Sequence, residues 1–146
     1  MRVAVGVDHG AFFVKQAVID HIETLGHTVT DLGTFDDSSC DYPDVVQELA
    51  PKVASGEFDR GILLCGTGIG MSIAANKVKG VRAALCHDAF SARLTRQHND
   101  SNILCMGGRV LGVGPMLDIV GIWLGEAFDG GRHQRRIDKV AQLETP

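Results

Sequence analysis

Cys65 is followed by a run of alternating glycines, and this segment carries the most specific chemistry in the sequence. Glycines stand at positions 66, 68 and 70, with Thr67 and Ile69 between them. Glycine permits positive φ angles and a close approach of the main chain to a ligand. The amino terminus of a helix after such a turn attracts anions. The run therefore predicts an anion-binding turn, and a plain strand-to-helix connection is the alternative interpretation.

The thiol of Cys65 stands at the last strand-like position before that turn. A thiolate is the reactive form of cysteine, and a helix amino terminus favours it. We therefore consider Cys65 a candidate base or nucleophile, although free cysteines more often act as small buried hydrophobes. Cys86 and Cys105 fall in or just after apolar runs and Cys40 falls in a loop, so we interpret these three as structural. The spacing of the cysteines gives neither a CxxC pair nor a zinc-finger pattern.

Two further groups of polar residues stand where segments end. Asp8 and His9 follow an apolar run, where they could bind hydroxyls or phosphate or move a proton. His98 and Asn99 end a helical segment, where a histidine could act as a general acid–base. The structural alternatives are a capped loop for the first pair and a helix C-cap for the second.

Arginines form the candidate phosphate contacts. Arg132 and Arg136 are four residues apart in the last helical segment, so they share one helix face. Two guanidinium groups on one face suit bidentate binding of a phosphate, and a solvated charged face is the alternative. Arg109 follows a different apolar run and is a separate candidate.

The elements that must position these residues alternate between short apolar runs and amphipathic helical stretches. Strands are predicted at 3–7, 28–32, 61–65, 81–85 and 103–106, with 3–7 and 61–65 as buried ones, and a helical segment follows each strand. This alternation predicts an α/β fold, with a five-stranded parallel sheet in a three-layer α/β/α, Rossmann-like arrangement. We expect one domain over residues 1–146, with ligands bound outside the carboxyl ends of the strands.

Composition and charge argue against several classes of protein. The chain has 146 residues, 45% of them hydrophobic, with a formal net charge of −4. That charge argues against a nucleic-acid partner, and no apolar stretch is long enough for a membrane span or a signal peptide. With cysteines that show no disulfide pattern, we expect a soluble, reduced, cytoplasmic protein.

Residues 65–77 closely resemble the signature of type B ribose-5-phosphate isomerases. The resemblance extends, in order over nearly the whole chain, to residues 8–9, 41–43, 96–102, 107–110 and 130–136. These segments together are far more specific than any one of them. The wider family also includes galactose-6-phosphate and allose-6-phosphate isomerases.

The resemblance implies a role for each matching residue. Cys65 is then the base that moves a proton between C1 and C2, His98 assists opening of the furanose ring, and Thr67 helps to handle protons. The implied substrate contacts are Asp8, His9, Tyr42, Gly66, Gly68, Ile69, Gly70, Asn99, Arg109, Arg132 and Arg136. The glycine turn and Asn99 would hold the developing enediolate, and the three arginines would gather around the phosphate. We expect no metal or organic cofactor.

The family also implies an assembly, a homodimer or a tetramer with sites at the dimer interface. Some relatives use a glutamate elsewhere as base, and the thiol of Cys65 favours the cysteine branch for this chain. The expected reaction is the interconversion of ribose 5-phosphate and ribulose 5-phosphate. A six-carbon phosphate, allose or galactose 6-phosphate, is the alternative substrate. A non-catalytic module that binds nucleotides or other phosphate ligands is the alternative class.

Overall fold

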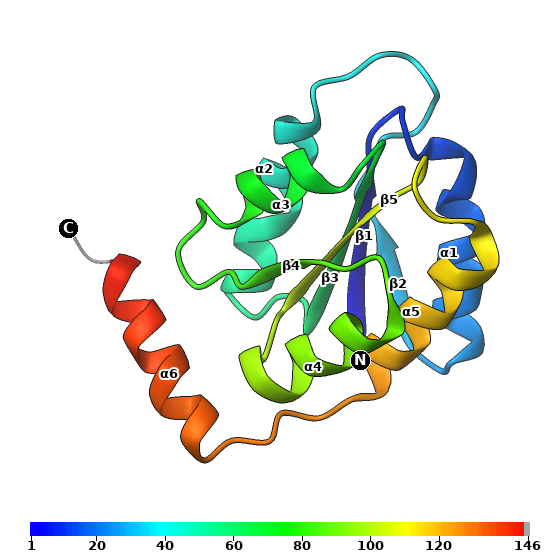
Figure 1. Cartoon of the computed structure of the whole chain (residues 1–146). Helices are drawn as coiled ribbons and strands as arrows, with labels where there is room; N and C mark the ends of the chain where they lie inside the picture. The colour runs from blue at the N-terminus through cyan, green and yellow to red at the C-terminus, as the bar shows by residue number, and fades with distance from the viewer. Residues whose placement is uncertain (145–146) are drawn as a thin grey trace.

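A parallel sheet forms the centre of the protein, as the computed structural model shows for residues 1–144 (Figure 1). Its strands are β1 (Arg2–Val7), β2 (Thr28–Asp31), β3 (Arg60–Cys65), β4 (Ala83–Leu85) and β5 (Ile103–Gly107). Within the described residues the sheet has five strands in the order β2-β1-β3-β5-β4, and every pairing is parallel. The predicted strand number and direction are confirmed.

Helices cover both faces of the sheet and complete the three predicted layers. They are α1 (Phe12–Thr24), α2 (Tyr42–Ala54), α3 (Ile69–Ala75), α4 (Ala89–Asn99), α5 (Val113–Gly125) and α6 (Arg132–Ala141), followed by a 3₁₀ turn, η1 (Gln142–Glu144). Helices α1, α4 and α5 pack on one face, and α2 and α3 pack on the other. Helix α6 stands apart from the layers at the end of an extended segment and contacts α4 (Figure 1).

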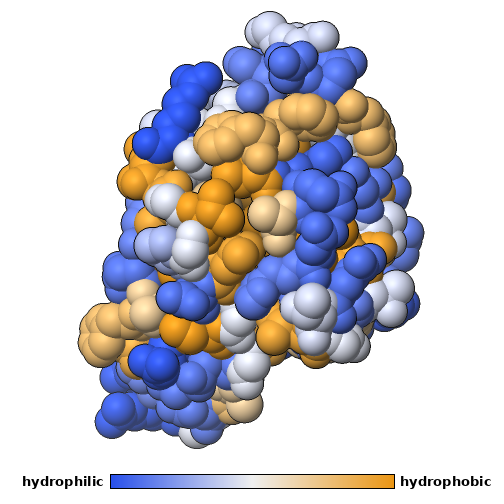
Figure 2. Space-filling model, turned by 90° about the vertical axis from the view of Figure 1, so that its right-hand side faces the viewer, coloured by the Kyte–Doolittle hydropathy of each residue, from blue (hydrophilic) through white to orange (hydrophobic). Residues whose placement is uncertain are grey.

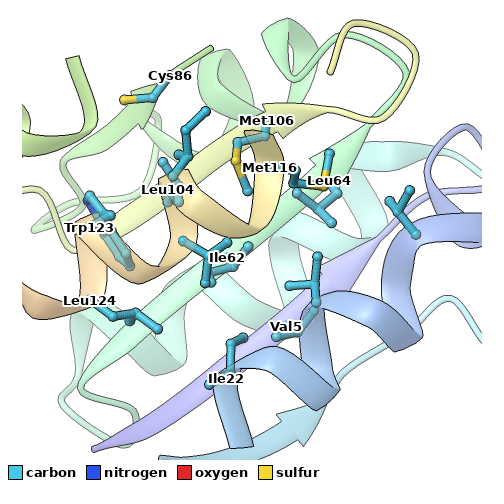
Figure 3. Packing of buried hydrophobic residues seen from close by; sticks show 14 of the residues in the cluster. Val5, Ile22, Ile62, Leu64, Cys86, Leu104, Met106, Met116, Trp123 and Leu124 are labelled. Carbon is cyan, nitrogen blue, oxygen red and sulfur yellow. The ribbon is translucent and has the colours of Figure 1, made fainter. Parts of the chain in front are cut away.

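Alternating side chains of the strands supply a separate core to each helical layer. Val5, Ile62 and Leu104 pack against α1 and α5, together with the fully buried Trp123 of α5 (Figure 3). Strand residues of the opposite parity, such as Leu63, pack beneath α2 and α3. A strand buried on both faces must be apolar at nearly every position, which explains the continuous apolar runs in the sequence.

Some element boundaries differ from the sequence prediction. The fourth strand begins at Ala83 instead of residue 81, because the backbone N–H of Arg82 donates to Oδ1 of Asn102 at 2.8 Å and not to a strand. Helix α5 begins at Val113, so Pro115 lies in its first turn, where a missing N–H is no loss. Asp88 caps the start of α4, since the Ser91 N–H donates to its Oδ1 at 2.7 Å.

The side of the molecule that carries α1 and α5 presents a band of hydrophobic residues between hydrophilic ones (Figure 2). Exposed apolar side chains on these helices include Phe13 and Val113. None of the helices in residues 1–144 has the length and apolar character needed to cross a bilayer.

Candidate active site

Three loops meet at the carboxyl edge of the sheet, where ligands bind in folds of this kind. A Cβ added to Gly10, after β1, would lie 3.0 Å from the Gly66 nitrogen, and one added to Gly107 would lie 2.8 Å from the Thr67 main chain. The Gly108 N–H donates to the Cys65 carbonyl at 2.8 Å. Only glycine allows backbones to approach this closely, so the glycines hold the three loops together.

The thiol of Cys65 lies inside this junction, with 5% of the residue exposed. Its Sγ accepts a hydrogen bond from the Gly68 N–H at 3.0 Å, and Gly68 has a φ of 77° that favours glycine. A donated N–H of this kind stabilises negative charge on the sulfur. The turn therefore aims a main-chain donor directly at the sulfur.

Two N–H groups of this turn, which the sequence suggested as donors to a ligand, are already hydrogen-bonded within the turn. Gly68 donates to Cys65, and Ile69 donates to the hydroxyl of Thr67 at 3.3 Å. Helix α3 has only seven residues, so its dipole is short.

Two side chains border the turn. The ring of Tyr42 would lie 2.7 Å from a Cβ on Gly70, and the guanidinium of Arg109 would lie 3.5 Å from a Cβ on Gly66.

Asp8 and His9 lie on the adjoining loop after β1, and the structure fixes both side chains. Oδ1 of the buried Asp8 accepts the Gly10 N–H at 2.7 Å. Nδ1 of His9 accepts the Cys40 N–H at 3.2 Å. A ring nitrogen that accepts a hydrogen bond carries no proton, so the neutral imidazole of His9 carries its proton on Nε2. His9 is thereby set up as a hydrogen-bond donor.

Replacing Cys40 by proline should remove the preference of His9 for the Nε2–H tautomer, because proline has no N–H to donate to Nδ1. We expect the ¹⁵N shifts of the His9 ring to move from a single Nε2–H tautomer toward a mixture. A matched Cys40→Ala variant keeps the N–H and should keep the wild-type shifts. Unchanged His9 shifts in a folded Cys40→Pro variant would show that the backbone bond does not select the tautomer.

A second group of predicted residues lies at the opposite side of the sheet, near the amino ends of the strands. Helix α4 runs back against the strand direction, so His98 and Asn99 at its carboxyl end lie near the start of β5. The His98 ring stacks on the ring of His133 with centroids 4.2 Å apart and planes 6° from parallel. His98, Asn99, His133 and Arg136 line a shared cavity of about 250 Å³ beside α6.

Within one chain the two groups do not meet. Cys65 ends β3, whereas His98 lies at the level where β5 begins, so the length of the strands separates them, roughly 15–20 Å. Arg109 borders the Cys65 turn, while Arg132 and Arg136 lie on α6. The expectation that the three arginines gather in one place is therefore not met by a single chain.

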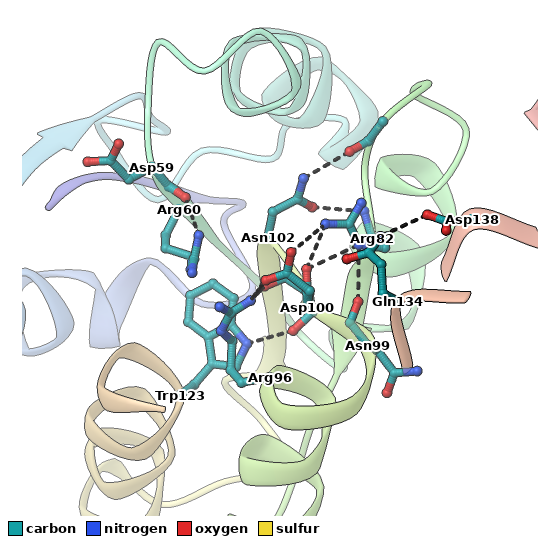
Figure 4. Close-up of polar contacts among 12 residues, drawn as sticks. Asp59, Arg60, Arg82, Arg96, Asn99, Asp100, Asn102, Trp123, Gln134 and Asp138 are labelled. Carbon is teal, nitrogen blue, oxygen red and sulfur yellow. Dashed lines mark hydrogen bonds and ion pairs between the residues drawn. The ribbon is translucent and has the colours of Figure 1, made fainter. Parts of the chain in front are cut away.

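A polar network fixes the end of α4 that carries His98 and Asn99 (Figure 4). The buried Arg96 donates to Oδ1 of Asp100 at 2.7 Å and to the Ser101 carbonyl at 2.6 Å. Arg82 donates to the carbonyls of Asn99 and Asp100 at 3.0 and 2.9 Å. Asp100 adopts the left-handed conformation, with a φ of 46°, and ends the helix. These contacts fix the main chain at the end of α4, next to His98.

Some residues that contact the predicted site residues lie outside the predicted set. Cys40 was interpreted as structural, although its backbone orients His9. His133 was not singled out; burial lowers its pKa, and the positive charges of His98, Arg132 and Arg136 lower it further. His98, Asp129 and His133 each place one potential metal-ligand atom within 4.8 Å of the others. In the sequence, this region is marked by Arg132 and Arg136 on one helix face and by the similarity over residues 130–136, and neither signal points to His133 or Asp129 as a ligand.

The remaining cysteines differ from Cys65 in their surroundings. Burial and the neighbouring Asp88 raise the pKa of the Cys86 thiol to about 11. Burial raises the pKa of the Cys105 thiol far above its usual range. Both thiols therefore stay protonated at neutral pH, as their interpretation as structural residues requires.

The chain belongs to the Ribose/Galactose Isomerase family, whose profile matches residues 3–140. It is 46% identical to ribose-5-phosphate isomerase B of Escherichia coli over 143 residues, covering 98% of this chain and 96% of the relative. The resemblance to type B ribose-5-phosphate isomerases is confirmed, and the protein is an isomerase. A non-catalytic binding module is thereby set aside.

Solved structures agree with this assignment. Ribose-5-phosphate isomerase B of Clostridium thermocellum superposes with a TM-score of 0.96 at 49% identity, covering 99% of this chain and 97% of that one. The enzyme of Mycoplasma genitalium, solved with bound ribulose-5-phosphate, gives a TM-score of 0.94 at 42% identity, covering 98% and 95%. Relatives with other names include a D-erythrulose-4-phosphate isomerase of Pectobacterium atrosepticum, 41% identical over 99% of this chain and 95% of the relative.

Proposed function

We propose that this protein interconverts ribose 5-phosphate and ribulose 5-phosphate through an enediolate, with Cys65 as the base. The observation that carries the proposal is the main-chain N–H of Gly68 donated to the Cys65 sulfur at 3.0 Å, in a junction of ligand-facing loops. The names of its relatives support the pentose phosphate as substrate.

The reaction moves one proton between neighbouring carbons of the open-chain sugar. The Cys65 thiolate takes the proton from C2 of the aldose, and the electron pair of that C–H bond forms the C1–C2 double bond of the enediolate. The thiol then returns the proton to C1, while a proton passes from the O2 to the O1 oxygen, a transfer assigned to Thr67. A positioned base of this kind contributes about 10²- to 10⁴-fold.

Negative charge develops on the oxygens during this transfer and must be stabilised. We assign this to the turn at residues 66–70, with Asp8 and His9 orienting the hydroxyls or the phosphate from the adjoining loop. Donors that are already in place act without reorganisation, and losing one costs about 3 kcal/mol of barrier. The Nε2–H of His9 suits an oxygen acceptor on the substrate.

We further propose that the working enzyme is a homodimer, or a tetramer of dimers, with each site built from two chains. The supporting observation is the position of His98 and Cys65 at opposite edges of one sheet. A symmetric pairing of two chains lets the Cys65 turn of one face the α4–α6 cavity of the other. His98 of the partner subunit would then assist ring opening, and Arg132 and Arg136 of the partner subunit would bind the phosphate.

A six-carbon sugar phosphate is the second candidate substrate, because one relative, 39% identical over 139 residues, is named a galactose-6-phosphate isomerase subunit. We expect kcat/KM for ribose 5-phosphate to exceed that for allose 6-phosphate and galactose 6-phosphate by about 10- to 200-fold. One extra carbon in a fitted pocket discriminates by about this factor. Parallel assays of the three sugars test the pentose assignment, and a higher kcat/KM on either six-carbon sugar would overturn it.

A further inference from the structure

We propose that His98, Asp129 and His133 form a binding site for a divalent transition-metal ion of the Zn²⁺ type, and that occupation of this site switches the enzyme off. The site lies between the carboxyl end of α4 and the start of α6, within a single chain. One ligand atom from each residue lies within 4.8 Å of the other two. Of the three residues, only His98 has a role in the steps proposed for catalysis.

The backbone holds the three residues in place before any ion arrives. The Asp129 N–H donates to the Gln97 carbonyl at 3.0 Å, which joins the linker to α4 next to His98. The His133 N–H donates to the Gly130 carbonyl, also at 3.0 Å. Gly130 has a φ of 65°, a conformation that suits glycine. This turn brings Asp129 and His133 to the same side, so binding requires only side-chain movement.

The distances fit zinc coordination after a small adjustment. Zn²⁺ binds histidine nitrogen at about 2.0–2.1 Å and carboxylate oxygen at about 2.0–2.2 Å, usually in a tetrahedron whose donor atoms are about 3.4 Å apart. Donors that lie within 4.8 Å of one another must approach by at most about 1.5 Å. The two rings, now parallel, must also tilt so that their nitrogens aim at one point.

The donor set selects the kind of ion. Two imidazoles with one carboxylate suit Zn²⁺ and its neighbours among the transition metals, whereas Mg²⁺ and Ca²⁺ prefer oxygen ligands. Three protein ligands leave a fourth position for water or an anion. Arg132 and Arg136 on α6 oppose a cation, and the carboxylate of Asp129 offsets part of their charge. Moderate, reversible binding is the expected outcome.

The inhibitory consequence rests on the proposed function of His98. A nitrogen of His98 that is bonded to a metal can neither give nor take a proton during ring opening. Aiming a His98 nitrogen at the metal also breaks the parallel stacking of its ring on His133. Zinc should therefore lower turnover in proportion to occupancy, and a chelator should restore it.

The binding test is calorimetric titration of the full-length protein with Zn²⁺ alone, with Co²⁺ absorption as the spectroscopic readout. We expect one ion per chain and a four-coordinate Co²⁺ spectrum without a thiolate charge-transfer band. Asp129→Asn and His133→Gln should each weaken Zn²⁺ binding by about tenfold or more. Asp138→Asn is the matched control, since it makes the same change on α6 outside the cluster, and it should bind like wild type.

Activity assays separate the inhibitory role from the binding. Asp129→Asn should match the wild-type rate without zinc and resist zinc concentrations that inhibit wild type. Absence of saturable binding, a thiolate band, or equal binding by all variants would overturn the site. Normal binding with undiminished turnover would overturn the inhibition. Failure of the isomerase proposal itself would appear separately, as no turnover in wild type before zinc is added.

Discussion

Replacing Cys65 by alanine is expected to abolish isomerisation while the fold stays intact. The variant removes the only atom proposed to carry the proton between C1 and C2, so kcat should fall by at least about 10²- to 10⁴-fold. It deletes one buried sulfur and keeps the backbone of the turn, a change that costs about 1–2 kcal/mol of stability. Turnover of ribose 5-phosphate and the thermal unfolding transition measure the two effects separately.

A matched thiol control is available in Cys86. Its pKa is raised to about 11, mainly by burial, so it holds its proton at neutral pH and cannot serve as the base. Cys86→Ala should therefore lose a similar amount of stability and keep its turnover. Near wild-type turnover in Cys65→Ala would show that the base has been assigned to the wrong residue.

The elements of the fold could be predicted from the sequence because each has a local cause. Strands such as 61–65 are continuous apolar runs that need burial on both faces, and the glycines after Cys65 need a positive φ or a close backbone approach. The start of the fourth strand was misplaced because Asn102, distant in sequence, takes the N–H of Arg82. Local patterns contain no information about such a partner.

Contacts between distant segments also decide the details of the candidate site. The bond from Cys40 to His9 joins residues 31 apart, in a loop with no regular pattern. The stacking of His98 on His133 depends on where α6 is placed after the extended segment. By contrast, the separation of His98 from Cys65 follows from the predicted elements, because a helix that connects parallel strands ends at their amino edge. The resemblance assigns Cys65 and His98 to one reaction, and only the topology shows that they lie at opposite ends of the strands.

Mixing two inactive variants should restore activity if each site is built from two chains. In a heterodimer of Cys65→Ala and His98→Gln chains, one site pairs an intact Cys65 with an intact His98, and the other site lacks both. By symmetry such a heterodimer has one working site of two, so it should show about half the wild-type turnover. Either variant alone should show almost none.

The measurement uses co-expressed chains with two different affinity tags, so that heterodimers can be isolated. Co-expression of Cys65→Ala with itself under both tags is the control for handling and tag effects. If each site were contained in one chain, every chain of the heterodimer would carry a damaged site, and activity would stay at the level of the single variants. Because His98 lies at the opposite edge of the sheet from Cys65, recovery requires the partner chain to supply it.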